Sequence, residues 1–119
     1  LKGKCVLVVD NDQAVREALS SLVQSWGAHV FACQTLEQAL ALAEQPQLML
    51  VDYHLDDGKV GVEVIAALRE KWQLHIPAIV NTADPNEAVR EHVVSAEALF
   101  LPKPVKQAAL KRLIKRVGV

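Results

Sequence analysis

Four polar residues come at or just after the ends of short apolar runs, and their side chains could hold a cation and a phosphoryl group. They are Asp10 after residues 6–9, Asp52 after residues 48–51, Thr82 just past residues 79–80, and Lys103 just past residues 99–101. Side chains at the carboxyl ends of parallel strands face the crevice where open α/β sheets bind ligands. Two carboxylates, a hydroxyl and an ammonium that meet there would bind a divalent cation and a phosphoryl group.

Asp52 is the expected nucleophile of this set. It ends an apolar run, where an ionised carboxylate is costly unless a cation or a covalent bond to phosphorus compensates it. A carboxylate can attack phosphorus and form an acyl phosphate, although an acid that only caps the following loop is the alternative. The Thr82 hydroxyl can donate to a phosphoryl oxygen, and the Lys103 ammonium is a compact charge suited to phosphate. Lys103 precedes Pro104, and X-Pro bonds are the ones that can be cis.

Asp10, Asn11 and Asp12 form a polar cluster at the end of the first apolar run. Asp and Asn are good helix N-caps, so Asn11 or Asp12 could begin the following helix. A single residue suffices for a cap, and the rest of the cluster then needs another role. Mg²⁺ prefers oxygen ligands and keeps several waters, so acids from the ends of two adjacent strands would form a binding site for it.

Apolar runs alternate with helical patterns five times along the chain. Strands are expected at residues 5–9, 28–33, 48–51, 78–80 and 99–101, and helices at 14–26, 36–43, 61–72, 86–95 and 105–117. This (βα)5 alternation predicts a parallel sheet with helices on both faces and right-handed crossovers. We therefore expect a single α/β domain over residues 1–119, doubly wound and flavodoxin-like, with strand order 2-1-3-4-5.

Composition excludes several other classes. The chain has 119 residues, the usual size of one domain, and 51% of them are hydrophobic. The net charge of −1 argues against nucleic acid as a partner. No apolar stretch is long enough to cross a membrane. Because the chain opens at Leu1 with no Met, we expect a fragment of a longer protein.

These motifs together resemble the response-regulator receiver domains of two-component signalling. The resemblance rests on residues 8–12, on Asp52, on Thr82 followed by Ala83, and on Lys103 followed by Pro104. It extends over almost the whole chain. The combination in this order on a (βα)5 pattern is specific, although each part alone is weak.

The resemblance implies a role for each site residue. Asp52 would take a phosphoryl group from a histidine kinase or a histidine phosphotransfer domain, and Thr82 and Lys103 would contact the phosphoryl oxygens. Phe100 stands where the family has a rotating aromatic switch. The implied ligands of Mg²⁺ are Asp10, Asn11, Asp52 and the backbone carbonyl of His54, with Asp12 as a further candidate.

The chain departs from the family pattern at two places. Where the family has two adjacent acids, this chain has Asp10 and Asn11, so we expect weakened but not abolished Mg²⁺ binding. A Pro often follows the phosphoacceptor by four positions, and Asp56 stands there instead. Together with Asp57 and Gly58 it predicts a polar, flexible loop beside the site.

Phosphorylation would change the face formed by the fourth helix, the fifth strand and the fifth helix. The fourth helix has the poorest apolar pattern, with Val89, Val93 and Val94 as its main anchors, which suits an element that moves. An ordinary surface helix is the alternative. A homodimer through this face is a further expectation.

Two rival functions remain at this stage. Residues 8–12 also resemble the start of haloacid-dehalogenase-type phosphatases, in which Asp10 would be the nucleophile. Alternatively, Asn11 could mark a receiver-like interaction module that is never phosphorylated. We expect a phosphoacceptor domain, not an enzyme, located in the bacterial cytoplasm. The resemblance favours a hybrid sensor histidine kinase as its parent protein, which could tether it to a membrane.

Overall fold

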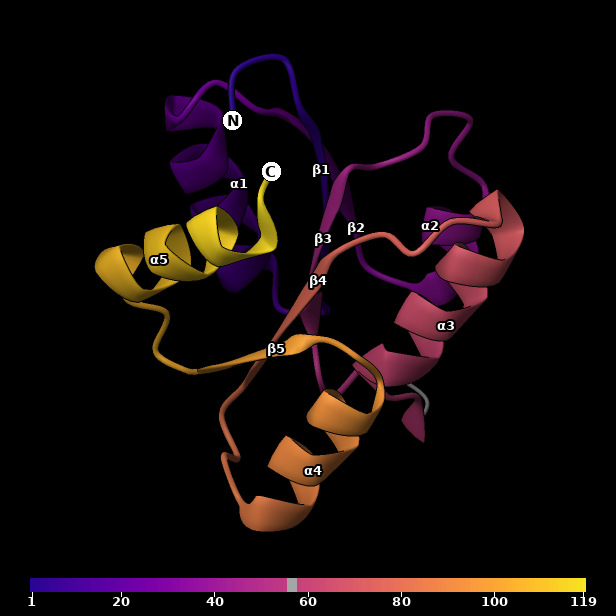
Figure 1. Ribbon diagram of the computed structural model, residues 1–119, viewed down its shortest axis with the longest axis vertical. Helices are drawn as coiled ribbons and strands as arrows, with labels where there is room; N and C mark the ends of the chain where they lie inside the picture. Colours follow the sequence, from indigo (N-terminus) through magenta and orange to yellow (C-terminus); the bar gives the residue numbers. More distant parts are fainter. Residues whose placement is uncertain (56–57) are drawn as a thin grey trace.

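The computed structural model describes residues 1–55 and 58–119, and in these residues strands and helices alternate from one end to the other. Figure 1 shows the elements, which are β1 (Cys5–Val9), α1 (Gln13–Ser25), β2 (His29–Cys33), α2 (Leu36–Leu40), β3 (Leu48–Asp52), α3 (Gly61–Trp72), β4 (Ala78–Thr82), α4 (Glu87–Ser95), β5 (Leu99–Pro102) and α5 (Gln107–Val117).

The strands form one parallel sheet in the order β2-β1-β3-β4-β5, which confirms the predicted fold class and strand order. The central strands β1 and β3 are buried along almost their whole length. This explains why they read as continuous apolar runs, since a parallel sheet is covered on both faces. The register pairs Val9 with Val51 and Asp52 with Asn81, so the polar residues that follow come level at one edge.

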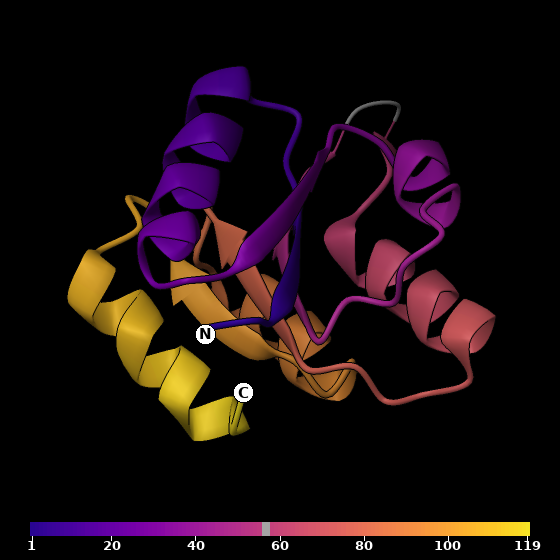
Figure 2. The same ribbon diagram turned by 90° about the horizontal axis from the view of Figure 1, so that it is seen from above.

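Helices cover both faces of the sheet. Helices α1 and α5 lie on one face, and α2 and α3 lie on the other (Figure 2). Alternate strand residues separate into two cores accordingly. Val6, Val8, Leu48, Leu50, Ile79 and Leu101 pack with α1 and α5, and Leu7, Val9, Met49, Val51, Ala78 and Val80 pack with α3 and α4. Because side chains alternate along a strand, the face of each site residue follows from its neighbours.

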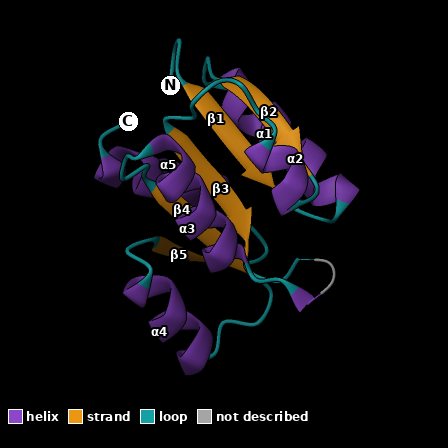
Figure 3. Ribbon diagram, turned by 90° about the vertical axis from the view of Figure 1, so that its right-hand side faces the viewer, coloured by secondary structure: helices purple, strands orange, loops and turns teal. Residues whose placement is uncertain are grey.

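Helix α4 lies at the β5 edge of the sheet (Figure 3). Val89 and Val93 are buried in the core shared with α3, as expected. The expectation that Val94 also anchors this helix is wrong, because its side chain is 62% exposed. Val94 follows Val93 directly, and adjacent residues of a helix point in different directions. The helix therefore has fewer buried contacts than its sequence suggests.

Three element boundaries differ from the sequence-based expectation by two residues or more: the end of α2, the end of β4, and the start of α5, which is Gln107 and not residue 105. Helix α2 ends at Leu40, not at residue 43, and the Lys71 ammonium from α3 donates to the free Leu40 carbonyl. In a longer helix that carbonyl would accept from an N–H four residues later. Strand β4 continues to Thr82, beyond the predicted residue 80, because it keeps pairing with β3 and β5.

Gly61 lets α3 begin directly against the end of β3. Its N–H donates to the Tyr53 carbonyl at 2.7 Å. A Cβ atom built on Gly61 would lie 2.3 Å from the Asp52 carbonyl oxygen. Any larger residue would therefore push α3 away from the backbone of Asp52.

We expect Gly61→Ala to lower the free energy of unfolding by about 1–3 kcal/mol, because the added methyl group forces α3 to shift. Urea denaturation would measure this loss. Ala66→Ser, at an exposed position of the same helix, is the control and should change stability by no more than about 0.5 kcal/mol. Equal stabilities of Gly61→Ala and the native protein would contradict the close approach.

Candidate functional site

Two buried carboxylates lie side by side at the carboxyl edge of the sheet. Asp10 directly follows β1, and Asp52 is the last residue of β3. Asp10 is 0% exposed and Asp52 is 6% exposed. Each acid comes directly after Val9 or Val51, which pair with each other across β1 and β3. Both acids therefore lie on the face of the sheet that α1 and α5 cover. The sequence placed these two acids together correctly.

The Lys103 ammonium joins the two carboxylates. Its Nζ lies 3.5 Å from Asp10 Oδ2 and 3.4 Å from Asp52 Oδ1. The Lys103 N–H donates to the Thr82 carbonyl at 2.7 Å, which ties the residue after β5 to the end of β4. The bond from Lys103 to Pro104 is cis. One cation therefore serves two buried anions.

This arrangement leaves Asp52 short of compensating charge. Burial raises the pKa of Asp52 above its ordinary value, and the neighbouring Asp10 charge raises this pKa further. Lys103 acts in the opposite direction without cancelling these effects. A carboxylate in this setting would be stabilised by a further cation or by a bond that removes its charge.

Asp12 begins α1. Its Oδ1 accepts hydrogen bonds from the N–H groups of Ala14 at 2.9 Å and Val15 at 3.2 Å, which confirms the predicted N-cap. The Asp12 N–H in turn donates to Asp10 Oδ1 at 2.9 Å. The cap therefore orients one oxygen of Asp10, and Asn11 lies half-buried between the two acids.

Thr82 belongs to the other face of the sheet. It is fully buried and alternates with Asn81, so it shares the face of Val80. Its Oγ1 accepts from the Asp84 N–H at 3.0 Å. Phe100 packs half-buried against this same core. The Arg90 guanidinium of α4 lies 4.6 Å from the centre of the Phe100 ring, so Phe100 contacts α4 on the face that Thr82 shares.

The segment after Asp52 also contacts α4. The Tyr53 hydroxyl and His92 Nδ1 are hydrogen-bonded at 2.7 Å. The Tyr53 ring also meets the His54 ring edge to face, with 4.8 Å between the centres. His54, whose backbone carbonyl is a predicted metal ligand, pairs with Val60 through an isolated antiparallel bridge. The predicted polar loop at Asp56 and Asp57 lies outside the described residues.

The sequence interpretation missed one polar residue of this edge and the tie between Tyr53 and His92. Asn81 is the β4 residue level with Asp52, and it is buried. The signal was an amide directly after the apolar residues 78–80. For Tyr53 and His92 no signal existed, because 39 positions separate them and only the fold brings them together.

The donor set of this edge suits a hard cation. Among the described residues, no three His, Cys, Asp or Glu side chains are grouped to hold a metal ion. Mg²⁺ needs no such group, because it binds through one or two carboxylates and keeps several waters. Asp10 and Asp52 supply these two carboxylates.

A largely apolar groove lies next to Lys103. It encloses about 480 Å³ between α1 and the segment after β5. The residues that line it are Val15, Ala18, Leu19, Leu22, Ala83, Lys103, Pro104 and Val105.

In the described part of the chain, no helix is long and apolar enough to cross a bilayer.

Comparison with known proteins identifies the class. Residues 6–115 match the model of the response regulator receiver domain, and the chain belongs to this family of signalling domains. It is 35% identical over 102 residues to the KDP operon transcriptional regulatory protein KdpE of Escherichia coli, covering 83% of this chain and 44% of that protein.

A second relative and a solved structure show the same likeness. The chain is 30% identical over 106 residues to a cyclic di-GMP phosphodiesterase of Thermotoga maritima, covering 89% of this chain and 28% of that protein. It spans less than half the length of these two relatives. A response regulator protein from Burkholderia pseudomallei, solved with a phosphorylated aspartic acid, a calcium ion and citrate, superposes with a TM-score of 0.80 at 25% identity, covering 90% of this chain and 64% of that one.

We expect Asp52→Asn to raise the free energy of unfolding by on the order of 1 kcal/mol at neutral pH without divalent cations. The folded domain holds a proton on Asp52 more tightly than the unfolded chain does, because the pKa of Asp52 is raised. Ionised Asp52 therefore destabilises the fold above this raised pKa, and the gain from Asn disappears as pH falls below the ordinary carboxyl range.

Urea denaturation at a series of acidic to neutral pH values would measure this difference. Asp84→Asn, at an exposed neighbouring position, is the control and should show little change. A loss of stability in Asp52→Asn at neutral pH would mean that the attraction of Lys103 outweighs burial and the repulsion from Asp10.

Proposed function

We propose that Asp52 accepts a phosphoryl group from the phosphohistidine of a histidine kinase or a histidine phosphotransfer domain. The observation that carries this proposal is the Lys103 ammonium within 3.5 Å of both buried carboxylates, Asp10 and Asp52. The phosphorylated aspartic acid of the Burkholderia protein supports the same assignment.

The proposed transfer needs only an oxygen nucleophile and compensating charge. An Asp52 carboxylate oxygen attacks phosphorus, a P–O bond forms, and the P–N bond to the donor imidazole breaks. The imidazole leaves with the electron pair of that bond and takes up a proton. Lys103 and the Thr82 hydroxyl then donate to the phosphoryl oxygens, which carry more negative charge than the carboxylate did.

We propose Mg²⁺ as the cofactor, held by Asp10, Asp52 and the backbone carbonyl of His54, with Asn11 as a neutral ligand. When bound, Mg²⁺ neutralises charge that builds up on the phosphoryl oxygens. Asp12 is the weaker candidate for a ligand, because one of its oxygens already caps α1.

The site gives phosphorylation a route to the surface. As the Thr82 hydroxyl turns from the Asp84 N–H toward the phosphoryl group, space opens on the face that it shares with Phe100. Phe100 can then turn inward and away from Arg90, which loosens α4. The proposed output surface is therefore α4, β5 and α5.

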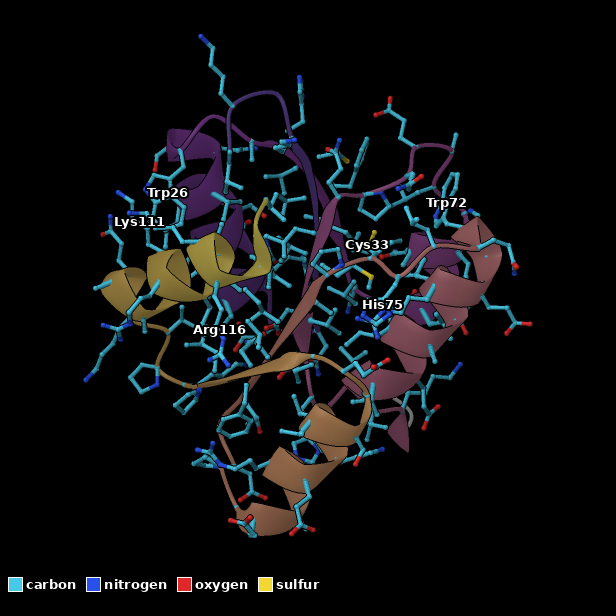
Figure 4. The ribbon with its side chains drawn as sticks, in the orientation of Figure 1. Trp26, Cys33, Trp72, His75, Lys111 and Arg116 are labelled. Atoms are coloured by element: carbon cyan, nitrogen blue, oxygen red, sulfur yellow. The ribbon has the colours of Figure 1, made fainter. Side chains whose placement is uncertain are left out.

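The partners follow from the surfaces beside the site. We propose that a helix of the phosphohistidine donor docks in the groove at Lys103, because this groove adjoins the acceptor site. Helix α5 is basic, with Lys111 and Arg116 on it (Figure 4), and α4 carries the exposed acids Glu87 and Glu91. A second copy that pairs Glu87 and Glu91 of α4 with basic α5 is the proposed dimer.

The parent protein and its location stay predictions. We propose that the domain works as one part of a longer signalling protein, with a hybrid sensor histidine kinase as the expected parent. A cytoplasmic position belongs to this proposal. The complete coding sequence of the gene would test the expected parent.

We expect acetyl phosphate and Mg²⁺ to label the domain on Asp52, as detected by mass spectrometry of its peptides. Asp52→Ala should remain unlabelled, whereas Asp84→Ala should label normally. Label on Asp10 would instead favour the phosphatase-like alternative. A folded native domain that takes no label would favour an interaction module that is never phosphorylated.

We expect Asn11→Asp to tighten Mg²⁺ binding at least about fivefold, because a charged oxygen ligand replaces a neutral one. Isothermal titration calorimetry would measure both affinities. Asp12→Asn removes a charge but retains a good N-cap, so it should change the affinity much less. An Asn11→Asp variant that binds no more tightly would contradict the assignment of Asn11 as a ligand.

A further inference from the structure

Asn81 is the polar residue that β4 contributes to the face of the two carboxylates. It pairs in register with Asp52 of the neighbouring strand. It alternates with Val80 and therefore shares the face of Ile79, which packs in the same core as Leu50. Because Asp52 alternates with Val51 and also belongs to the face of Leu50, the Asn81 and Asp52 side chains rise from adjacent strands on the same side.

The side-chain nitrogen of Asn81 is buried in the sheet. The residue is 3% exposed, and its Nδ2 has no hydrogen-bond partner among the described residues. An unpaired buried amide destabilises a fold, whereas an apolar side chain with the same branching would not. Leu at position 81 would thus make the fold more stable than Asn does, unless the Asn81 amide finds an acceptor in another state of the domain.

Phosphorylation would create the need for a donor at this position. In the unphosphorylated domain Lys103 shares its ammonium between Asp52 Oδ1 and Asp10 Oδ2. Under the proposed function this ammonium turns to the phosphoryl oxygens after transfer. The Asp52 oxygen that is not bonded to phosphorus then becomes a buried carbonyl oxygen, and Lys103 is drawn away from it. Its lone pairs can serve both the proposed Mg²⁺ and one hydrogen-bond donor.

We propose that Asn81 is a positioning residue whose side-chain N–H donates to this remaining Asp52 oxygen in the phosphorylated state. The inference rests on the proposed function of Asp52 and deepens it. Thr82 does not fill this role, because its side chain starts from the opposite face and its hydroxyl is assigned to the phosphoryl group under the proposed function. The two consecutive residues of β4 thus donate to different groups: Thr82 donates to the phosphoryl group, and Asn81 donates to the Asp52 side chain.

Beryllofluoride, which binds an aspartate oxygen and mimics a phosphoryl group, provides the test. In excess Mg²⁺, Asn81→Leu should bind beryllofluoride about fivefold more weakly than the native domain, as expected for one lost hydrogen bond to a carbonyl oxygen. Ser20→Ala is the matched control. It removes another buried polar atom without a partner in the described residues, and it should leave the affinity unchanged.

The side-chain amide of native Asn81 gives a second readout that does not depend on a variant. In ¹H–¹⁵N NMR spectra, one Asn81 amide proton should move downfield and exchange more slowly with solvent when beryllofluoride binds. Asn86, whose oxygen caps α4, serves as the internal comparison. Its amide protons should not show this slowed exchange.

Unchanged beryllofluoride affinity in Asn81→Leu, or unchanged Asn81 amide signals in the bound native domain, would overturn the inference and leave the proposed function standing. A native domain that binds no beryllofluoride at Asp52 would overturn the proposed function and this inference with it. The two failures are therefore distinguishable in one series of titrations.

Discussion

One ammonium shared by two buried carboxylates is the interaction on which this site depends. Asp10 and Asp52 are forced together because β1 and β3 are adjacent and in register. Lys103 reaches both from the end of β5, two strands away from β3. Two anions and one cation in a buried place leave a deficit of positive charge. Chemistry that adds a metal ion or moves charge outward onto phosphoryl oxygens is favoured in such a place.

The two buried carboxylates and the two candidate switch residues lie on opposite faces of the sheet. Asp10, Asp52 and Asn81 lie on the face of α1 and α5, whereas Thr82 and Phe100 lie on the face of α3 and α4. Under the proposed function, a change at Asp52 would reach α4 through β4. Helix α4 is also held by Arg69 of α3, which donates to the carbonyls of Ala96 and Glu97 just after this helix. Under the proposed function, the start of α4 would move while Arg69 holds its end.

Much of this arrangement was predictable from the sequence, and the reason is physical. Buried parallel strands need continuous apolar runs, so an acid such as Asp52 at the end of a run marks both the strand and the edge where sites form. The Asp12 cap was predictable because capping is a local property of the chain. The fold class and strand order followed from the alternation of these runs.

The remaining features depend on contacts between distant segments. At the early end of α2, the Leu40 carbonyl accepts from Lys71, which is 31 positions away. Pairing of β4 with its neighbours carries the strand on to Thr82 and brings Asn81 level with Asp52. The exposure of Val94 depends on which side of α4 faces the sheet. The three valines among residues 89–94 do not specify this side.

A crystal structure of the domain with Mg²⁺ and beryllofluoride tests the central claim most directly. The account predicts beryllium on an Asp52 oxygen, with the Lys103 ammonium turned from the Asp10 and Asp52 carboxylates toward fluorine. Beryllium bound elsewhere, or a Lys103 that still bridges the two carboxylates beside a bound fluoride, would contradict it.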